Sequence, residues 1–424
     1  MRPFTVRFLL IGTILLLGVN CSVNAALDDD YFNYLKSVFE QQDRKLADYL
    51  IEELNSYIRL FPQSVHVAEV RFLKARVVAD SRDEHRAFIL FMKTLYLNPN
   101  SVVHNKCAEG ARVIVTTNKQ YRDHKNELTL LINGEFAPGK PADLLYQYLT
   151  FLHDLGMDKL RRWSLVEYQE FVDLYPDDVR AEKIQYWIAE AYMLLGDYRE
   201  AAASFMKFEH LYPDSHLVPS VRIRRADILD EKLKNPELAV QALTAVIEDF
   251  PQTGNAGTAL FNRADIKASR FKDINGAIAD YQLLVHEMPQ HNKAVDALFE
   301  LAEIYIKKQK NYRQALDTYN QIVADYPENR KCISALEESA KIYLDKQKQP
   351  VSAADSYGKV ADLFPDDPKS PEMLLKAGEI CQNKAKIIDQ ALVYYERLVA
   401  QYPQSDQAGK AREKIAKILG QPEN

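Results

Sequence analysis

The chain has 424 residues, 47% of them hydrophobic and 27% charged, which fits a folded soluble protein of two or three domains. Its net charge of −6 argues against nucleic acid as the main partner, because phosphate binding requires concentrated lysine and arginine. Only 14 residues are glycine, which predicts few turns with positive φ and few phosphate-cradling loops.

The first 25 residues have the pattern of a secretory signal peptide. Arg2 and Arg7 precede an apolar run from Phe8 to Val19, and a small-residue cleavage site ends at Ala25. The run is too short to span a bilayer, which needs ~20 residues. We expect cleavage after Ala25, export to the periplasm and no transmembrane span. Cys21 leaves a lipid anchor as the alternative, although Asn20 stands where lipoprotein signals usually carry a small residue.

Beyond this segment, prolines recur at intervals of 37 to 39 residues. Most follow a large residue, and a Ser, Thr, Asp or Asn suited to an N-cap commonly stands two positions later. Because proline cannot continue a helix, each interval predicts a helix that ends at the proline and another that starts soon after it. The prolines are Pro62, Pro99, Pro138, Pro176, Pro213, Pro251, Pro289, Pro327, Pro365 and Pro403.

Small residues recur inside each interval at two fixed places. The position thirteen residues after the proline is usually alanine, as at Ala264 and Ala302, and so is the position twelve before the next proline, as at Ala277 and Ala315. Large residues follow three or four positions later on the same helix face. Small residues let two helices approach closely, so each interval predicts a helical hairpin. One hairpin cannot bury its apolar face alone, but a row of them can.

Small-x-x-Tyr on the first helix, Ala-x-x-x-aromatic on the second and a closing proline resemble the tetratricopeptide repeat, well over residues 140–424 and more loosely over 30–100. The resemblance implies an all-α fold, in which tandem helix-turn-helix repeats of about 38 residues form a curved solenoid. The family's usual period is about 34, so longer helices or turns are expected. Units of this length are similar to those of the bacterial envelope proteins BamD and YbgF (CpoB).

The pattern weakens between Lys106 and Pro141, where the chain has its only cluster of glycine and proline, at residues 134–141. We expect a loop or bend there. The predicted organisation is therefore a signal peptide at 1–25, divergent helical repeats at 26–140, and a tetratricopeptide array at 141–424 that ends in a capping helix.

The sequence contains no nucleophile elbow, Walker loop, dinucleotide fingerprint or HExxH motif, so no catalytic residue, cofactor or metal is expected. The pairs His210/His216 and His286/His291 flank proline joins and are more readily solvated turn residues than metal ligands. Core packing is likewise favoured over sugar stacking for the two tryptophans.

Three cysteines remain after the signal peptide: Cys107, Cys332 and Cys381. They form no CxxC pair, and Cys332 and Cys381 are expected at opposite ends of adjacent helices, too far apart for a disulfide. We interpret all three as small buried hydrophobes.

One pattern suggests a binding surface. In tetratricopeptide arrays the first helix of each pair lines the concave face, and here its tenth and fourteenth positions after the proline are mainly apolar and mainly acidic, respectively. Stacked repeats would form an apolar stripe beside an acidic ladder, suited to a peptide with apolar and basic residues. The alternative is that the apolar residues pack between repeats and the carboxylates are merely solvated. The candidate residues are Tyr186, Glu190, Ile223, Asp227, Phe261, Asp265, Phe299 and Glu303.

These observations favour a non-catalytic scaffold of the bacterial cell envelope that binds other proteins or peptides along this groove. A lipid-anchored subunit of an outer-membrane assembly or secretion complex is the first alternative. An envelope enzyme or polysaccharide-processing factor is the second; it would need a deep polar pocket within residues 100–160.

Overall fold

The computed structural model describes residues 21–420 of the chain. The signal peptide and lipid anchor predicted for residues 1–25 lie outside the described residues, except for the helical backbone of 21–25. All regular secondary structure from residue 21 to residue 420 is helical, which confirms the predicted all-α class.

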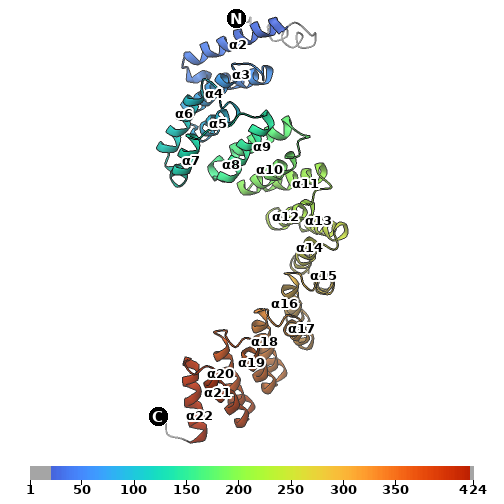
Figure 1. Cartoon of the computed structure of the whole chain (residues 1–424). Coiled ribbons are helices and arrows are strands. Elements are labelled where there is room, and N and C mark those ends of the chain that lie inside the picture. The colour runs from blue at the N-terminus through green and yellow to red at the C-terminus, as the bar shows by residue number, and fades with distance from the viewer. Residues whose placement is uncertain (1–20, 421–424) are drawn as a thin grey trace. The chain divides into compact units, whose positions relative to one another are not determined.

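The chain forms two compact units, Met1–Tyr212 and Pro213–Asn424, each built of helices in antiparallel pairs (Figure 1). The first unit holds α2 (Cys21–Glu40), α3 (Ala47–Leu60), α4 (Val67–Asp80), α5 (Glu84–Leu97), α6 (His104–Thr117), α7 (Lys125–Ile132), α8 (Pro141–Leu155), α9 (Asp158–Leu174), α10 (Ala181–Leu195) and α11 (Tyr198–Leu211). The second unit holds α12 (Val218–Asp227), α13 (Pro236–Asp249), α14 (Gly254–Ile266), α15 (Ile274–Glu287), α16 (Ala294–Ile304), α17 (Tyr312–Asp325), α18 (Lys331–Ile342), α19 (Pro350–Leu363), α20 (Ser370–Ile380), α21 (Ile388–Gln401) and α22 (Asp406–Leu419).

The Tyr-Pro joins end helices as predicted. After α17, Tyr326 leaves the helical conformation with φ −133°, while its N–H still bonds the Ile322 carbonyl. Pro327 then offers no N–H to continue the helix. The Tyr326 hydroxyl donates to the Pro289 carbonyl at 2.8 Å, and Tyr402 donates to the Pro365 carbonyl at 2.7 Å. In these repeats the aromatic residue before the proline therefore also ties one join to the preceding join.

The predicted N-caps are only partly correct. Thr253 and Ser405 cap α14 and α22 through the N–H three residues on. Elsewhere the side chain bonds the N–H two residues on and shapes a turn before the helix starts, as Asn329 does with Lys331 and Asp367 with Lys369. The helix then begins later because the join itself contains a turn.

A π-helical turn explains why most prolines in the second unit are 38 rather than 37 residues apart. In the 37-residue intervals that start at Pro62 and Pro176, the first helix closes with a bond from an N–H to the carbonyl five residues back. In the second unit the corresponding bond reaches six residues back, as from Asn311 to Tyr305. The extra residue lies in a π-turn at the end of each first helix. These π-turns are Ile228–Lys232, Lys267–Phe271, Tyr305–Gln309, Tyr343–Gln347 and Cys381–Ala385.

The prediction of few positive-φ turns was wrong. After each π-turn the chain needs a left-handed residue, and lysine rather than glycine occupies it. Gly196 takes the same place after α10, with φ 82°. Scarcity of glycine did not exclude left-handed turns, because lysine accepts the conformation at an energetic cost. Lysines stand there five times: Lys234, Lys272, Lys310, Lys348 and Lys386.

The small residues lie where the helices touch. Ala264, Ala302 and Ala340 are fully buried. Gly378 occupies the same place in the next pair, where an added Cβ would lie 2.4 Å from the ring of Tyr395. The apolar contacts of the second unit form three successive clusters along the chain.

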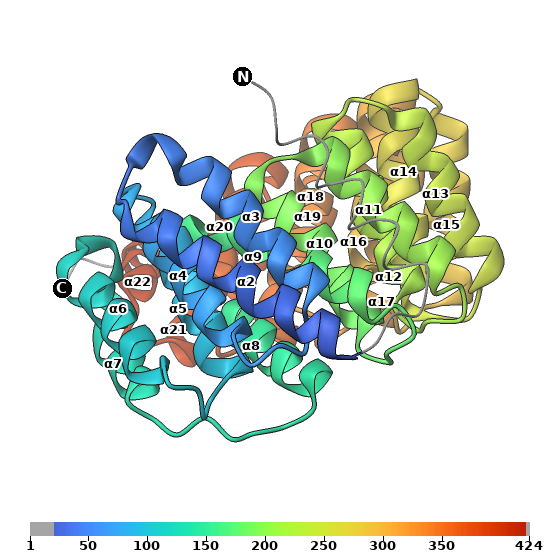
Figure 2. The same cartoon turned by 90° about the horizontal axis from the view of Figure 1, so that it is seen from above.

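The first unit is packed differently. One apolar cluster runs from Phe32 to Ala191, and α5 packs against α8 and α9 as well as against its chain neighbours α4 and α6. The loop predicted near residue 134 is present between α7 and α8 (Figure 2), with Phe136 edge-on to Tyr96 at 4.8 Å. This loop does not divide the compact units, whose boundary lies at residues 212 and 213.

An ion cluster lies inside this first core. Lys93 of α5 is 2.6 Å from both Glu167 and Glu170 of α9, and the Lys93 and Glu167 side chains are less than a tenth exposed. Burial opposes the charged form of Lys93, but the two carboxylates keep its pKa raised. Burial and the neighbouring Lys93 lower the pKa of Lys74 to about 8.

Cys107, Cys332 and Cys381 are free and fully buried, as the sequence predicted. Burial raises the pKa of Cys107 to about 12 and that of Cys381 to about 11. Trp187 is also buried, and Trp163 packs against the same cluster.

Candidate partner-binding surface

The eight residues proposed for the groove lie on the first helices of consecutive pairs. Tyr186 and Glu190 belong to α10 in the first unit. The other six belong to the second unit, two each on α12, α14 and α16: Ile223, Asp227, Phe261, Asp265, Phe299 and Glu303.

The apolar members hold each first helix against the second helix of its own pair. Phe261 is edge-on to Tyr281 of α15 with ring centroids 5.5 Å apart, and Phe299 meets Tyr319 of α17 at 5.6 Å. Ile223 is buried, whereas Phe261 and Phe299 stay partly exposed. In the first unit, Tyr186 is edge-on to Phe205 at 6.1 Å. The aromatic residues therefore contribute to the core and leave only part of each ring for a partner.

The acidic members have specific neighbours. Asp265 accepts a hydrogen bond from the buried Tyr281 hydroxyl, and burial raises its pKa. Asp227 accepts a bond from the Asn262 amide at 3.2 Å. Burial, followed by the charge of Glu231, raises the pKa of Asp227 to about 6. Glu303 pairs with Lys307 one turn later. These carboxylates are more constrained than solvated surface charges.

A second column of polar residues, which the sequence analysis did not identify, faces the first. It stands eleven positions after each proline and thus 35 residues beyond the acidic member of the preceding pair: Asn262, Glu300, Glu338, Lys376 and Lys414. Glu300 shows the effect, since partial burial raises its pKa and the charges of Asp265 and Glu303 raise it further. Comparing the eleventh position across repeats would have revealed this column.

We define the acidic joint as Asp265, Glu300, Glu303, Glu338 and the hydroxyl of Tyr319, on α14, α16, α17 and α18. Tyr319 is 1% exposed, and its hydroxyl has no hydrogen-bond partner among the residues that the structure describes. Its counterpart 38 residues earlier, Tyr281, donates to Asp265. Burial raises the pKa of Tyr319, and the charges of Glu303, Glu338 and Glu300 add to the shift. A buried hydroxyl without a partner costs free energy.

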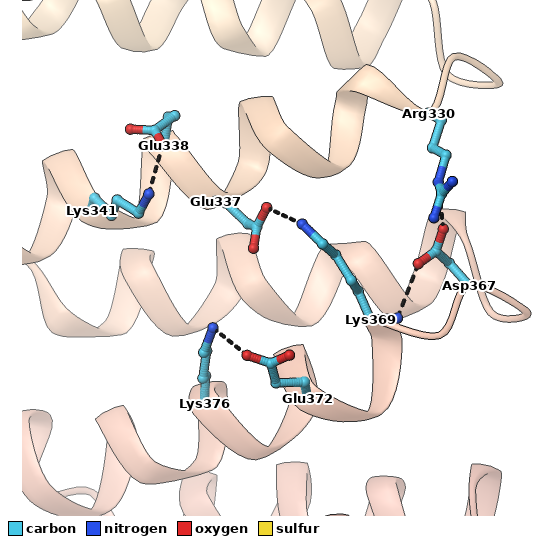
Figure 3. A network of polar contacts seen from close by, with 8 residues as sticks. All are labelled: Arg330, Glu337, Glu338, Lys341, Asp367, Lys369, Glu372 and Lys376. Carbon is cyan, nitrogen blue, oxygen red and sulfur yellow. Dashed lines mark hydrogen bonds and ion pairs between the residues drawn. The ribbon is translucent and has the colours of Figure 1, made fainter.

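Basic residues pair with carboxylates on α18, on α20 and in the joins that precede these helices (Figure 3). Lys341 lies 2.6 Å from Glu338, and Lys376 lies 2.7 Å from Glu372. Across the pairs, Lys369 contacts Glu337 at 2.9 Å and Arg330 contacts Asp367 at 2.9 Å. Within the joint, Asp265 and Glu300 are the carboxylates that form no ion pair with another residue of 21–420.

Two cavities lie in the first unit. The larger, of about 550 Å³, is lined mainly by apolar residues such as Leu131 and Phe136, with the carboxylates of Glu127 and Glu135 at its wall. In the smaller, of about 280 Å³, His153 stacks on Trp187 at 3.9 Å, and burial lowers the pKa of His153.

Among residues 21–420, no three His, Cys, Asp or Glu side chains gather closely enough to hold a metal ion. No helix in this range combines the length and the apolar character that crossing a membrane requires.

Comparison with known proteins identifies the repeats. The tetratricopeptide repeat profile matches residues 184–215, 222–253, 296–329 and 372–405, so the chain contains repeats of this family. No curated protein matches the chain.

Solved structures with similar folds include PilF of Pseudomonas aeruginosa, with 16% identity over 55% of this chain and 98% of that chain and a TM-score of 0.34. A tetratricopeptide repeat protein of Parabacteroides merdae is 14% identical over 64% of this chain and 98% of that chain, with a TM-score of 0.37. The C-terminal part of a repeat protein of Cytophaga hutchinsonii is 16% identical over 63% of this chain and 98% of that chain, with a TM-score of 0.40. At these identities and TM-scores the likeness carries no argument about function.

Proposed function

We propose that the protein is a non-catalytic scaffold of the bacterial cell envelope that binds partner proteins or peptides along the first helices of its repeats. Tetratricopeptide repeats typically mediate protein–protein interaction, which supports the scaffold role. In this proposal the eight candidate residues belong to the binding surface, and the array begins near residue 141.

The acidic joint is the observation that carries the proposal. Four carboxylates lie on neighbouring first helices, and the charges of three of them raise the pKa of the unpartnered Tyr319 hydroxyl. Lys307 and Lys341 pair with Glu303 and Glu338, which leaves Asp265 and Glu300 without a cationic partner at hydrogen-bond distance. A lysine ammonium from a partner has three donors and would satisfy the carboxylate oxygens of Asp265 and Glu300.

Site-specific crosslinking in the native cell tests this surface. A photoreactive phenylalanine analogue at the exposed position Lys307 should capture a partner segment that contains lysine or arginine, while the same group at Glu248, near the end of α13, should not. Capture of acidic segments only, or equal capture at both positions, would argue against the acidic joint as the binding site.

Neutral variants then measure the contribution of charge. Glu300→Gln with Glu303→Gln should weaken binding of the crosslinked partner by about tenfold or more, because two complementary charges are lost. The matched control is Glu248→Gln with Asp325→Asn, which removes two exposed carboxylates near the ends of second helices. Unchanged affinity in the first variant, with helicity preserved in both, contradicts the proposal.

The envelope location is tested by the mass of the mature N-terminus. A chain that begins at Ala26 supports a soluble periplasmic scaffold, and a diacylated Cys21 supports the lipid-anchored alternative. A chain that retains residues 1–25 after fractionation would refute export through a cleaved signal.

A further inference from the structure

Five lysines of the second unit hold a backbone conformation that glycine adopts more easily. Their φ angles lie between 54° and 59°, and all five are exposed. They follow the π-turns at intervals of 38 residues: Lys234, Lys272, Lys310, Lys348 and Lys386. The left-handed region brings Cβ close to the following carbonyl, so every residue but glycine is strained there.

The fold itself does not require lysine at this place. After α10 the same place is taken by Gly196, where an added Cβ would meet no atom within 4 Å. Burial does not explain the lysines either, because their side chains are exposed, and none of the five forms an ion pair within the described chain. One of the ammonium groups has a partner, since Lys272 donates to the Ser269 carbonyl at 2.5 Å. The repetition of strain at all five positions indicates that the charge itself is useful.

Further cations surround these turns. We define the basic edge as the five lysines together with Arg270, Lys308, Lys346 and Lys384, all exposed. The carboxylates on the same turns are fewer, and two are already engaged: Asp230 pairs with Arg270, and Asp273 caps α15. The others are Glu231, Glu237, Asp345 and Asp389.

Contacts within the second unit place successive turns side by side. Arg270 reaches back to Asp230 on the preceding turn, with Nε 2.8 Å from the carboxylate. Lys346 lies 5.9 Å from the centre of the Tyr312 ring, at the start of α17. Because two of the four junctions show this contact and the turns recur with the stacked hairpins, the lysines form a row rather than isolated charges.

Exposed apolar side chains lie among these cations. Phe271 precedes Lys272 and is 40% exposed; Ile387 and Ile388 follow Lys386 and are 41% and 42% exposed. Lysines beside exposed apolar residues are typical of surfaces that rest on a lipid bilayer, where ammonium groups meet phosphates and apolar groups enter the acyl boundary. An acidic protein would match the charges but would not account for the exposed Phe and Ile.

We propose that the basic edge binds the surface of membranes that contain anionic lipids. The residues involved differ from those of the acidic joint, so this proposal stands or falls independently of partner binding there. Attraction of each lysine to an anionic surface is additive over the row and is weakened by salt.

Vesicle flotation with the full mature chain tests the proposal. The probe is vesicles of phosphatidylglycerol and phosphatidylcholine in about equal parts, compared with pure phosphatidylcholine, at low and at high salt. The chain should float only with the anionic vesicles, and at low salt. The variant replaces Lys272, Lys310, Lys348 and Lys386 with glycine, which removes four charges and relieves the backbone strain. Its partition coefficient should fall by at least about tenfold while its Tm stays the same or rises.

The matched control replaces four exposed lysines outside these turns with glutamine: Lys207, Lys359, Lys410 and Lys417. It has the same net charge as the glycine variant and should keep its partition coefficient within about twofold. Equal loss in both variants, equal flotation with both vesicle types, or no flotation at low salt would overturn the proposal. Self-association without vesicles that the glycine variant abolishes would overturn it too, because the edge would then bind a second copy.

Discussion

The two units build helical hairpins with different rules of contact. In the second unit the apolar contacts fall into successive clusters in chain order, and most proline intervals are 38 residues. In the first unit one cluster joins α2 to α10, α5 packs against helices that are not its chain neighbours, and a charged group is enclosed at the centre. A regular period therefore reports local stacking, and its loss reports a shared core.

The largest expected effect tests the shared core of the first unit. Lys93→Ala leaves two carboxylates near the core without their cation and should cost about 3–5 kcal/mol. Hydrogen exchange should accelerate throughout α4–α10 because these helices share one cluster. The double variant Lys93→Met with Glu167→Leu should recover much of the loss; exchange that accelerates only in α5 and α9 would show that the core is not cooperative.

A matched glycine pair tests local stacking in the second unit. Gly378→Ala forces Cβ against the Tyr395 ring and should cost about 1–3 kcal/mol, with faster exchange confined to α20–α22. Gly409→Ala in α22 meets no atom within 4 Å and should be neutral or stabilising by about 0.5–1 kcal/mol. Faster exchange as far away as α13 would contradict nearest-neighbour stacking.

The left-handed turns allow opposite substitutions in the two units. Gly196→Ala should destabilise the first unit by about 1 kcal/mol, because φ there is 82°. Lys310→Gly should stabilise the second unit by less than about 1 kcal/mol, since relief of strain is partly offset by the greater freedom of unfolded glycine. Urea denaturation measures both, and the same sign in both would refute the strain at lysine.

The smallest effect concerns pH. The pKa of Asp227 is raised from its ordinary value of 3.8, taken for the unfolded chain, to about 6 in the folded protein. The folded state therefore binds the proton more tightly. The contribution of Asp227 to stability should therefore rise as pH falls from 7 towards 4, by well under 1 kcal/mol because the side chain is partly exposed. Asp227→Asn should remove this dependence and raise Tm slightly at neutral pH. A stability that falls as pH falls over the same range, in the wild type but not in the variant, would show that folding lowers the pKa of Asp227 instead.

The sequence predicted most of the fold because proline, alanine and aromatic positions act locally. Pro327 ends a helix and Ala302 marks a close approach whatever surrounds them. The fold of the first unit was harder to predict, since the pairing of Lys93 with Glu167 joins residues 74 positions apart and leaves no periodic signal. In the sequence, the only sign of the π-turns was one extra residue in each interval between the repeated prolines.

The candidate surface was predicted in outline. The apolar stripe and the acidic ladder were predicted from the tenth and fourteenth positions after each proline. Whether Phe261 faces a partner or Tyr281 depends on side-chain packing, which the repeat period does not reveal. Asp265 illustrates the same limit, because its bond to Tyr281 comes from the neighbouring helix. Predicting the facing column, which includes Glu300, would have required knowing how far each helical pair is displaced along the chain from the pair stacked on it.

The three buried thiols have a consequence for the export proposed above. An odd number of cysteines in an oxidising compartment invites mispaired crosslinks, and exchange proceeds through the thiolate. Enclosure of Cys107, Cys332 and Cys381 keeps them protonated and out of reach of oxidants once folding is complete. For the proposed export, the hazardous interval is the time between translocation and folding, and rapid local closure of each hairpin would shorten it.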